Sequence, residues 1–444
     1  MEKRFFHSLF LALFALLICS CTNSTSTVIS FDSEEFDYNY NFLSLFYYKA
    51  DSELGSKKDY KFSPDTVNYR KYPEVANVLV MYHEMSDLFT KYYPHVYYDY
   101  LTALLNASTA EKTPGMDVDS NLTVVHVYPN GSAADEGIKK GDVILSVDSI
   151  DLEGLYSRYT KLVDSSNASS FLISLVRGTD TLAKTVANET ILLPTVFLDS
   201  INKIPVITVT EFTDSTNNPK GTAAEFKDVL EETDGATSTV IDLRGNGGGS
   251  VDVCEEMAKD LLPSGDTVII QKSVGPNKAY TQQVSSVEFV KTTTNGIGKG
   301  RYYVLLLDSN SASCTEIFAA AITSNLKSPV VGTLSFGKGI GQYYVETPDQ
   351  AYGAATALRF LDKNGESYHT YGIVPDFEIT NSDSAMAKAV ELAKNATYKR
   401  TARYGTSVIS YWQQVKSKKL VSKNPFDLSS IKQGGAFKKI CPAF

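Results

Sequence analysis

The stretch YYVLLLDSNSASCTEIFAAAI, from Tyr302 to Ile322, reads as a strand, a turn of small hydroxyl residues and a helix. Its apolar run ends at Asp308, and its alanine-rich segment follows Ser313. A serine at such a turn lies beside the helix N-terminus, whose dipole and unpaired N–H groups can stabilise an oxyanion. The spacing Ser313-x-x-Glu316 also fits a capping box, which requires no catalysis. Taken alone, this stretch leaves both interpretations open.

The segments before this stretch alternate between strands and helices. Their strands are IPVITVTEF (204–212) and STVIDLRG (238–245), and their helices are GTAAEFKDVLEET (221–233) and SVDVCEEMAKDLL (250–262). Such alternation is typical of a mainly parallel sheet covered by helices. We therefore expect an α/β domain over residues 191–395.

A serine hydroxyl is a weak nucleophile and needs a base. The segment SFGKGIGQ (335–342) offers Lys338, which stands between two glycines after the apolar Phe336. A buried lysine can stay neutral and act as a base, although a solvated surface lysine is the simpler interpretation.

The run from Gly332 to Lys338 also fits G-x-x-x-x-G-K, but Gly339 follows where a phosphate-binding loop needs Ser or Thr. Nucleotide binding is therefore not favoured.

Two regions precede the α/β domain and differ from it in character. Residues 36–112 are rich in Tyr and Phe and show roughly helical spacing of apolar residues, which predicts a small helical domain. Residues 113–190 contain two strand-like segments, LTVVHVYP (122–129) and VILSVDSI (143–150), and predict a small β-rich domain. Residues 396–444 are rich in lysine and irregular, and we expect a peripheral extension there.

The N-terminus reads as an export signal. Lys3 and Arg4 precede an apolar run over residues 8–18 that is too short to span a bilayer comfortably. The sequence Ile18-Cys19-Ser20-Cys21 resembles a bacterial lipobox, which predicts a lipoprotein signal over 1–20, lipidation of Cys21 and a tether over 21–35. A plain secretory signal that is cut nearby is the alternative.

Composition excludes some classes of function. The chain has 444 residues and a net charge of −9, so nucleic-acid binding is not expected. Removal of residues 1–20 would change the net charge to about −10 and, with Cys21 lipidated, leave Cys254, Cys314 and Cys441 as the thiols. One disulfide is then permitted in an oxidising compartment, but the sequence does not say which pair.

Three segments, IDLRGNGGG (241–249), SNSASCTEIFAAAI (309–322) and SFGKGIGQ (335–342), resemble in this order the C-terminal processing peptidases, or tail-specific proteases. The resemblance implies that Ser313 is the nucleophile, Lys338 the base and Gln342 the residue that orients Lys338. It also implies an oxyanion hole formed by the backbone N–H groups of Gly248 and Cys314. Cys314 stands where the family usually has Ala. It would contribute its N–H in the same way, and a small buried side chain is the simplest interpretation of its thiol.

The segment NGSAADEGIKKGDVILSVD (130–148) resembles a PDZ domain in its bacterial-protease form. The resemblance implies a groove that takes a peptide C-terminus by strand addition. The carboxylate-binding loop would begin at Gly115-Met116-Asp117-Val118, which is short and unlike the usual pattern. A structural β-domain without a ligand is the alternative. The segments 87–98 and 372–379 also resemble parts of the family.

Together these features predict a multidomain α/β fold with a crotonase-like protease core, an inserted PDZ domain and an N-terminal helical domain. The expected function is that of a lipid-anchored envelope serine endopeptidase that captures substrate C-termini. A catalytically degenerate binding or scaffold lipoprotein is the alternative. The resemblance implies neither metal nor organic cofactor. The expected partners are protein or peptide substrates and the membrane, with no nucleic acid, and the chain could form a homo-oligomer.

Overall fold

The computed structural model describes residues 34–60, 72–105, 110–129, 131–163, 167–216, 221–401, 404 and 437–440. The predicted signal, Cys21 and most of the tether lie outside the described residues. None of the helices in these ranges is long and apolar enough to span a membrane.

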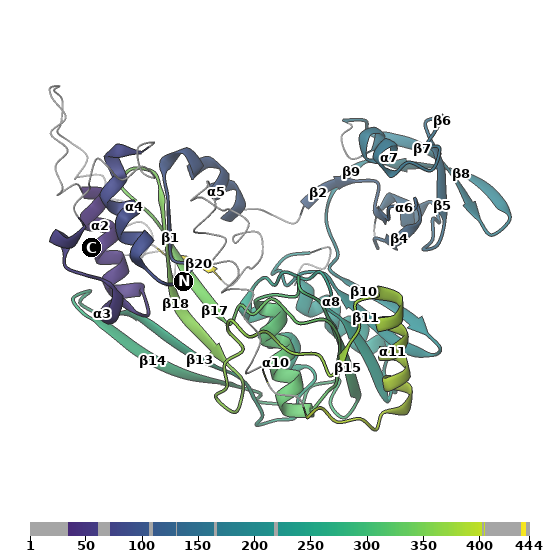
Figure 1. Cartoon of the computed structure of the whole chain (residues 1–444). Coiled ribbons are helices and arrows are strands. Elements are labelled where there is room, and N and C mark those ends of the chain that lie inside the picture. Colours follow the sequence, from purple (N-terminus) through teal and green to yellow (C-terminus); the bar gives the residue numbers. More distant parts are fainter. Residues whose placement is uncertain are drawn as a thin grey trace, which may run out of the picture.

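A six-stranded sheet forms the centre of the α/β region (Figure 1). Its first pair of strands is antiparallel and the remaining pairs are parallel. In spatial order the strands are β10 (Val196–Ile201), β11 (Ile204–Val209), β12 (Ser238–Asp242), β15 (Tyr302–Leu307), β16 (Val330–Gly332) and β19 (Phe377–Glu378). The alternation of strand and helix in the sequence thus produces the expected mixed α/β architecture.

Helices cover both faces of this sheet. They are α8 (Thr222–Glu232), α9 (Val251–Lys259), α10 (Cys314–Leu326) and α11 (Ser382–Asn395). On one face Ile241 and Leu305 pack with Phe318 of α10 and with residues of α8 and α9. On the other face the neighbouring residues Val240 and Val304 pack with α11. Because successive strand residues point to opposite faces, a continuous apolar strand can supply both cores.

A second sheet lies beside the first and is mainly antiparallel. Its order is β14 (Gln283–Lys291), β13 (Thr267–Pro276), β18 (Tyr352–Leu361), β17 (Ile340–Glu346) and β20 (Phe437–Ile440), and β1 (Lys91–Tyr93) also pairs with β18. Strand β17 begins immediately after the glycine-flanked Lys338. The second sheet therefore fixes the position of that lysine.

The N-terminal region contains helices that pack on the second sheet. They are α2 (Glu34–Phe46), α3 (Ala50–Glu53), η1 (Lys57–Asp59), η3 (Pro73–Val75), α4 (Ala76–Glu84), η4 (His95–Tyr97) and α5 (Tyr98–Leu105). Phe42, Phe46 and Met81 share one apolar cluster with Val345 and Ala355 of the sheet. The core of this region is therefore shared with β17 and β18.

A β-rich region forms a lobe beside the α/β region (Figure 1). Strands β2 (Ala110–Thr113) and β9 (Glu189–Leu192) pair where the chain enters and leaves it. The remaining elements are β3 (Met116–Val118), β4 (Val124–Val127), α6 (Ser132–Asp135), β5 (Val143–Val147), β6 (Ile150–Asp151), α7 (Tyr156–Leu162), β7 (Ser170–Arg177) and β8 (Asp180–Ala187). Its four-stranded sheet has the order β6-β5-β7-β8.

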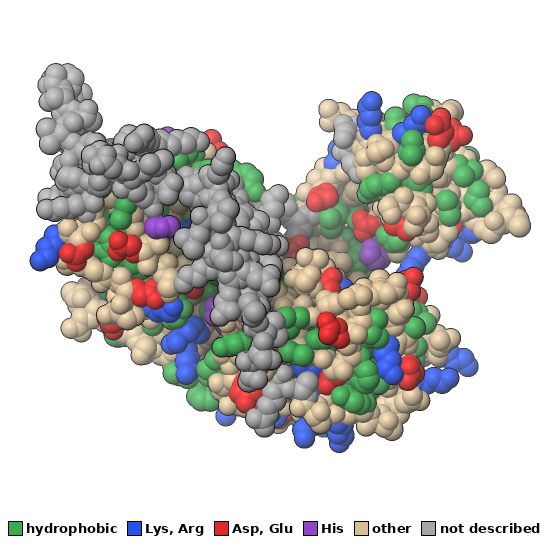
Figure 2. Space-filling view, in the orientation of Figure 1, with side chains coloured by type: hydrophobic (Ala, Val, Ile, Leu, Met, Phe, Trp, Pro, Cys, Tyr) green, Lys and Arg blue, Asp and Glu red, His purple; other side chains and the backbone are tan. Residues whose placement is uncertain are grey.

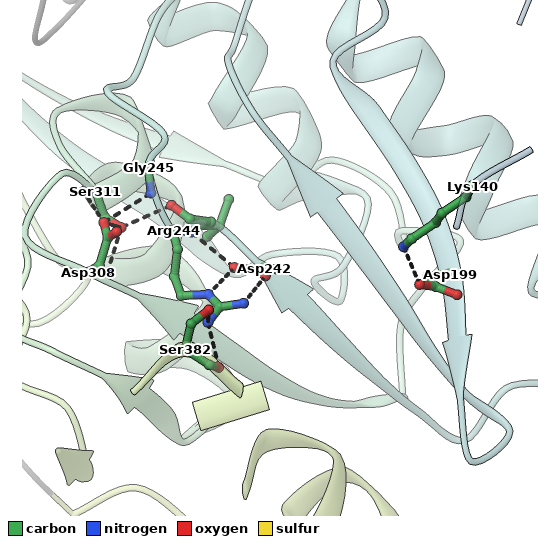
Figure 3. Close-up of polar contacts among 9 residues, drawn as sticks. Lys140, Asp199, Asp242, Arg244, Gly245, Asp308, Ser311 and Ser382 are labelled. Atoms are coloured by element: carbon green, nitrogen blue, oxygen red, sulfur yellow. Dashed lines mark hydrogen bonds and ion pairs between the residues drawn. The ribbon is translucent and has the colours of Figure 1, made fainter. Parts of the chain in front are cut away.

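Side chains of this lobe contact strand β10 of the central sheet. Lys140 Nζ lies 2.5 Å from Asp199 Oδ2, and this ion pair is exposed (Figure 3). The imidazole of His126 stacks on the Phe197 ring with a centroid separation of 3.9 Å. Exposed ion pairs contribute roughly 0–1 kcal/mol, so Lys140–Asp199 adds little to the attachment of the lobe.

The residues after α11 contact the central sheet as far as the structure describes them. Arg400 Nη1 lies 2.5 Å from Asp376 Oδ2, and both side chains are buried. On the face shown in Figure 2, acidic and basic side chains are interspersed over the described residues.

Candidate active site

Ser313 lies at the turn between β15 and α10, where it is the N-cap of the helix. Its backbone has φ 57° and ψ −115°, a strained conformation for a residue with a Cβ. Only 1% of its surface is exposed. Residues held in such sparsely populated backbone conformations cluster at functional sites.

Three hydroxyl side chains lie at this turn, and their partners differ. Ser311 Oγ donates to Leu243 O at 2.9 Å, and Thr315 Oγ1 donates to Asn246 O at 2.9 Å. Ser313 Oγ is buried and has no hydrogen-bond partner within the part of the chain that the structure describes. The hydroxyls of Ser311 and Thr315 therefore serve the fold, whereas the hydroxyl of Ser313 remains available for chemistry.

Lys338 is also 1% exposed, and its Nζ lies 4.9 Å from the centroid of the Phe89 ring. Burial lowers the pKa of Lys338 to about 8, against the attraction of the carboxylates of Asp87 and Glu316. With such a pKa, about a tenth of the amine is neutral at pH 7. The buried environment thus gives Lys338 the property that a lysine base needs.

The Glu316 carboxylate joins the nucleophile turn to the lysine loop. Its Oε2 accepts hydrogen bonds from both Ser313 N at 3.1 Å and Lys338 N at 2.7 Å. Its Oε1 accepts from Ser335 Oγ at 2.5 Å and from Gly337 N at 2.6 Å. Burial raises the pKa of Glu316 to about 7, although these hydrogen bonds favour the ionised form. Glu316 therefore caps helix α10, as its spacing from Ser313 predicts, and also binds the loop that carries Lys338.

Gln342 lies in β17, four residues after Lys338, and is buried. Its Nε2 donates to Thr356 Oγ1 on the neighbouring strand β18 at 3.3 Å. The loop after β18 brings His369 next to Gly339, the residue that follows Lys338. A Cβ added to Gly339 would lie 3.1 Å from His369 Cβ. Sequence reasoning missed His369, since it stands far from the three motifs and no local pattern marks it.

Gly248 lies against the nucleophile, because a Cβ added to it would meet Ser313 Cβ at 2.9 Å. Its φ of 112° also favours glycine. Its N–H donates to Asn246 Oδ1 at 2.8 Å, so the structure does not aim this group into the site. An oxyanion role for Gly248 would require this hydrogen bond to be shared or broken.

Cys314 N is the first helical amide of α10, one of those that a helix leaves without an intrahelical acceptor.

Arg244, which is half-buried, forms an ion pair with the buried Asp242 at the end of β12 (Figure 3). Arg244 contacts Asp242 through two hydrogen bonds of 2.6 and 2.9 Å and also donates to Ser382 of α11. Asp308 accepts from Gly245 N at 3.0 Å. These contacts fix the ends of β12 and β15, where the candidate residues begin.

Cys254 and Cys314 form a disulfide. It links α9 to the residue that directly follows Ser313. Cys314 is buried as expected, but its sulfur is covalently bonded and is not a free thiol. Both cysteines are fully buried in the core between the helices and the sheet.

The residues predicted to bind peptide lie in the β-rich lobe. Gly115 precedes β3 and packs against Gly131, since a Cβ added to Gly115 would lie only 3.0 Å from Gly131 Cα. Met116 is buried, and Asp117 accepts hydrogen bonds from Tyr128 OH and from His126 Nδ1. Val118 is half-buried. An acidic side chain thus stands within the predicted carboxylate-binding loop.

Among the residues that the structure describes, no group of three or more His, Cys, Asp or Glu side chains is placed to hold a metal ion.

Comparisons with known proteins agree with the α/β architecture. Residues 203–379 match the model of Peptidase family S41. The chain is 25% identical over 304 residues to a "Probable CtpA-like serine protease" of Staphylococcus haemolyticus (strain JCSC1435). The match covers 66% of this chain and 58% of the relative.

A relative of the same name from Staphylococcus aureus (strain COL) is 26% identical over 338 residues, which covers 71% of this chain and 64% of that protein. The chain thus spans less than two thirds of the length of these relatives. A solved structure from Bacteroides fragilis NCTC 9343, described as an S41 protease, has a TM-score of 0.50 and 15% identity. It covers 91% of this chain and 100% of that one, and it shows a likeness of fold alone.

Replacing Glu316 with Gln should destabilise the protein. The amide NH₂ would face N–H donors where a carboxylate oxygen now accepts, and each buried donor left unpaired costs about 1–3 kcal/mol. We expect the free energy of unfolding to fall by at least about 2 kcal/mol, measured by denaturant unfolding followed by circular dichroism. Glu255→Gln is the matched control, because burial also raises the pKa of Glu255 to about 7. Equal losses in the two variants would contradict the bridging role.

Removal of the disulfide should also lower stability. The bridge closes a segment with a sequence separation of 60 residues, for which chain entropy predicts about 4 kcal/mol. A Cys254→Ala/Cys314→Ala variant should lose this stability and then be insensitive to a phosphine reductant, whereas the wild type should lose it on reduction. Peptide mapping without reduction should recover the Cys254–Cys314 pair. A wild type whose unfolding does not respond to the reductant would contradict the bridge.

Proposed function

We propose that the chain is a serine endopeptidase of the C-terminal processing type, with Ser313 as nucleophile and Lys338 as base. The observation that carries this proposal is the single oxygen, Glu316 Oε2, that accepts from the backbone N–H groups of both residues. The contact holds a strained serine, whose hydroxyl is unpaired among the described residues, next to a buried lysine of lowered pKa. A serine hydroxyl needs such a base, and a solvated lysine would be protonated.

In the proposed mechanism, neutral Lys338 takes the proton of Ser313 Oγ as the hydroxyl attacks the scissile carbonyl. The tetrahedral oxyanion is held by Cys314 N–H at the helix N-terminus, where the helix dipole also favours negative charge. Gly248 N–H would join it once its hydrogen bond to Asn246 is shared or broken. Protonated Lys338 then gives its proton to the leaving amine, and water hydrolyses the acyl-enzyme. Gln342 orients the lysine amine throughout.

We further propose that residues 113–190 form a PDZ domain that binds the C-termini of protein or peptide substrates. Strand β3 follows the tight Gly115–Gly131 contact, which suits a loop whose backbone N–H groups hold a carboxylate. Lipidation of Cys21 would place the enzyme on a membrane of the cell envelope.

The alternative to the enzyme is a degenerate binding or scaffold protein. The hydroxyl of Ser313, which lacks a partner in the described part of the chain, argues against it, because a structural serine would be expected to make a hydrogen bond.

The purified full chain should cleave an unfolded protein such as casein, and Ser313→Ala should lower kcat by about 10⁴-fold or more. The rate should rise with pH through about 8, because only neutral Lys338 can accept the proton. Ser324→Ala is the control, since Ser324 lies on α10 and its Oγ donates within the helix. Activity that survives in Ser313→Ala, or that a chelator abolishes, would overturn the proposal.

The peptide-capture role is tested on the full-length Ser313→Ala protein by fluorescence anisotropy. A labelled peptide with an apolar, free C-terminus should bind at least about tenfold more tightly than the same peptide with an amidated C-terminus. Gly115→Ala should abolish the difference, because the new Cβ meets the backbone of Gly131. Gly178→Ala is the control, since Gly178 also has a positive φ but its Cβ would meet nothing within 4 Å. Equal binding of both peptides would contradict C-terminal recognition.

A further inference from the structure

A short segment of the N-terminal region covers the candidate site. Phe89 forms one apolar cluster with Ala312, Phe336 and Ile340, and Leu88 packs against it. Ala312 directly precedes Ser313, while Phe336 and Ile340 lie two residues before and after Lys338. The Phe89 ring is also the aromatic face over Lys338 Nζ. The segment over residues 87–90 therefore helps to exclude water from the lysine.

Asp87 shapes this segment. Its Oδ1 accepts hydrogen bonds from Phe89 N at 2.8 Å and from Thr90 N at 3.0 Å, and its side chain is buried. These contacts form a turn of the type in which an aspartate side chain binds the backbone that follows it. The position of the Phe89 ring thus depends on the Asp87 carboxylate.

The same oxygen connects the segment to Gln342. Thr356 Oγ1 donates to Asp87 Oδ1 at 2.8 Å, and Gln342 Nε2 donates to Thr356 Oγ1 at 3.3 Å. Thr356 N also donates to Thr90 Oγ1 at 3.0 Å. Thr356 is fully buried and is the register partner of Gln342 across β17 and β18. The hydrogen bonds that lead from Gln342 through Thr356 to Asp87 therefore pass through a threonine whose side chain and backbone are both hydrogen-bonded.

The direction of these hydrogen bonds has a consequence for Gln342. Because the Thr356 hydroxyl proton is used on Asp87, Thr356 offers Gln342 only its lone pairs. The Gln342 amide must then present its NH₂ group to Thr356, and its Oε1 lies on the opposite side. This is the orientation that Gln342 needs in order to accept a hydrogen bond from a lysine amine.

We propose that Asp87 is a positioning residue for the Ser313–Lys338 site, which it serves by fixing the Gln342 amide through Thr356 and the Phe89 cover over the lysine. The inference rests on the proposed function, because it assigns Asp87 a part in preparing the lysine base. Asp87 acts through other groups and does not contact the scissile bond.

The charge of Asp87 gives the proposal a measurable signature. Three titratable groups face Lys338: Asp87 from the 87–90 segment, Glu316 from α10 and His369 from the loop after β18. Burial lowers the pKa of Lys338, and the carboxylates of Asp87 and Glu316 raise it. Loss of the charge on Asp87 should therefore lower the pKa of Lys338 further. This shift tests whether the charge of Asp87 reaches Lys338, and the Thr356 variants below test the path through Gln342.

The test compares Asp87→Asn with Asp362→Asn in the full chain. Asn at position 87 retains an oxygen that can accept from the turn, so the variant removes the charge with little change of shape. Asp362 is the matched control, because it is buried and its Oδ1 also accepts two backbone N–H groups. The pKa of Lys338 is followed by NMR of ¹³C-labelled lysine, with its resonance assigned by its absence in Lys338→Met.

We expect the Lys338 pKa to fall by about one unit in Asp87→Asn, with the acid limb of the rate profile moving equally, and to stay fixed in Asp362→Asn. Thr356→Val should lower kcat at least about tenfold with KM unchanged, and Thr356→Ser, which retains the hydroxyl, should restore it. An unchanged Lys338 pKa in Asp87→Asn, an equal shift in Asp362→Asn or an unchanged kcat in Thr356→Val would overturn the proposal. A wild type that cleaves nothing overturns the proposed function alone, because the NMR titration requires no turnover.

Discussion

The buried carboxylate of Glu316 is the contact on which the site depends. It comes from the first turn of α10 and accepts hydrogen bonds from Ser313 N, Ser335 Oγ, Gly337 N and Lys338 N. The helix belongs to the central sheet, whereas the lysine loop leads into the second sheet. One side chain therefore sets the distance between two parts of the fold that could otherwise shift independently. Removal of a buried acceptor with this many donors is among the few single changes that destabilise strongly.

Several features of the site are unfavourable for stability and are held by the surrounding fold. Ser313 has a strained backbone, its buried hydroxyl lacks a partner among the described residues, and Lys338 loses most of its hydration. The Cys254–Cys314 bridge and the Asp242–Arg244 pair fix the neighbouring backbone. Such a combination is what a preorganised catalytic site requires, since its groups must not relax into more stable arrangements.

The sequence predicted the local structure around Ser313 well and the long-range surroundings of the candidate site less well. The strand, turn and helix around Ser313 follow from local pattern, and the glycines beside Lys338 marked a special backbone. Asp87 and His369 could not be found in this way, because long-range packing alone brings them to Lys338. The sequence did not say which two of the three cysteines pair. The packing of α9 against α10 brings Cys254 and Cys314 together. The direction of the Gly248 N–H also depends on its hydrogen bond to Asn246, which the motif residues alone do not reveal.

The most direct test of the account is covalent labelling of the full chain with a fluorophosphonate probe, followed by peptide mass spectrometry. The account predicts labelling at Ser313, with a rate that rises through about pH 8 as Lys338 loses its proton. It also predicts little labelling in Lys338→Met, and no labelling of Ser311 or Thr315 in either protein. Labelling at another residue, or labelling of Ser313 at an equal rate in Lys338→Met, would contradict the assignment of Lys338 as the base.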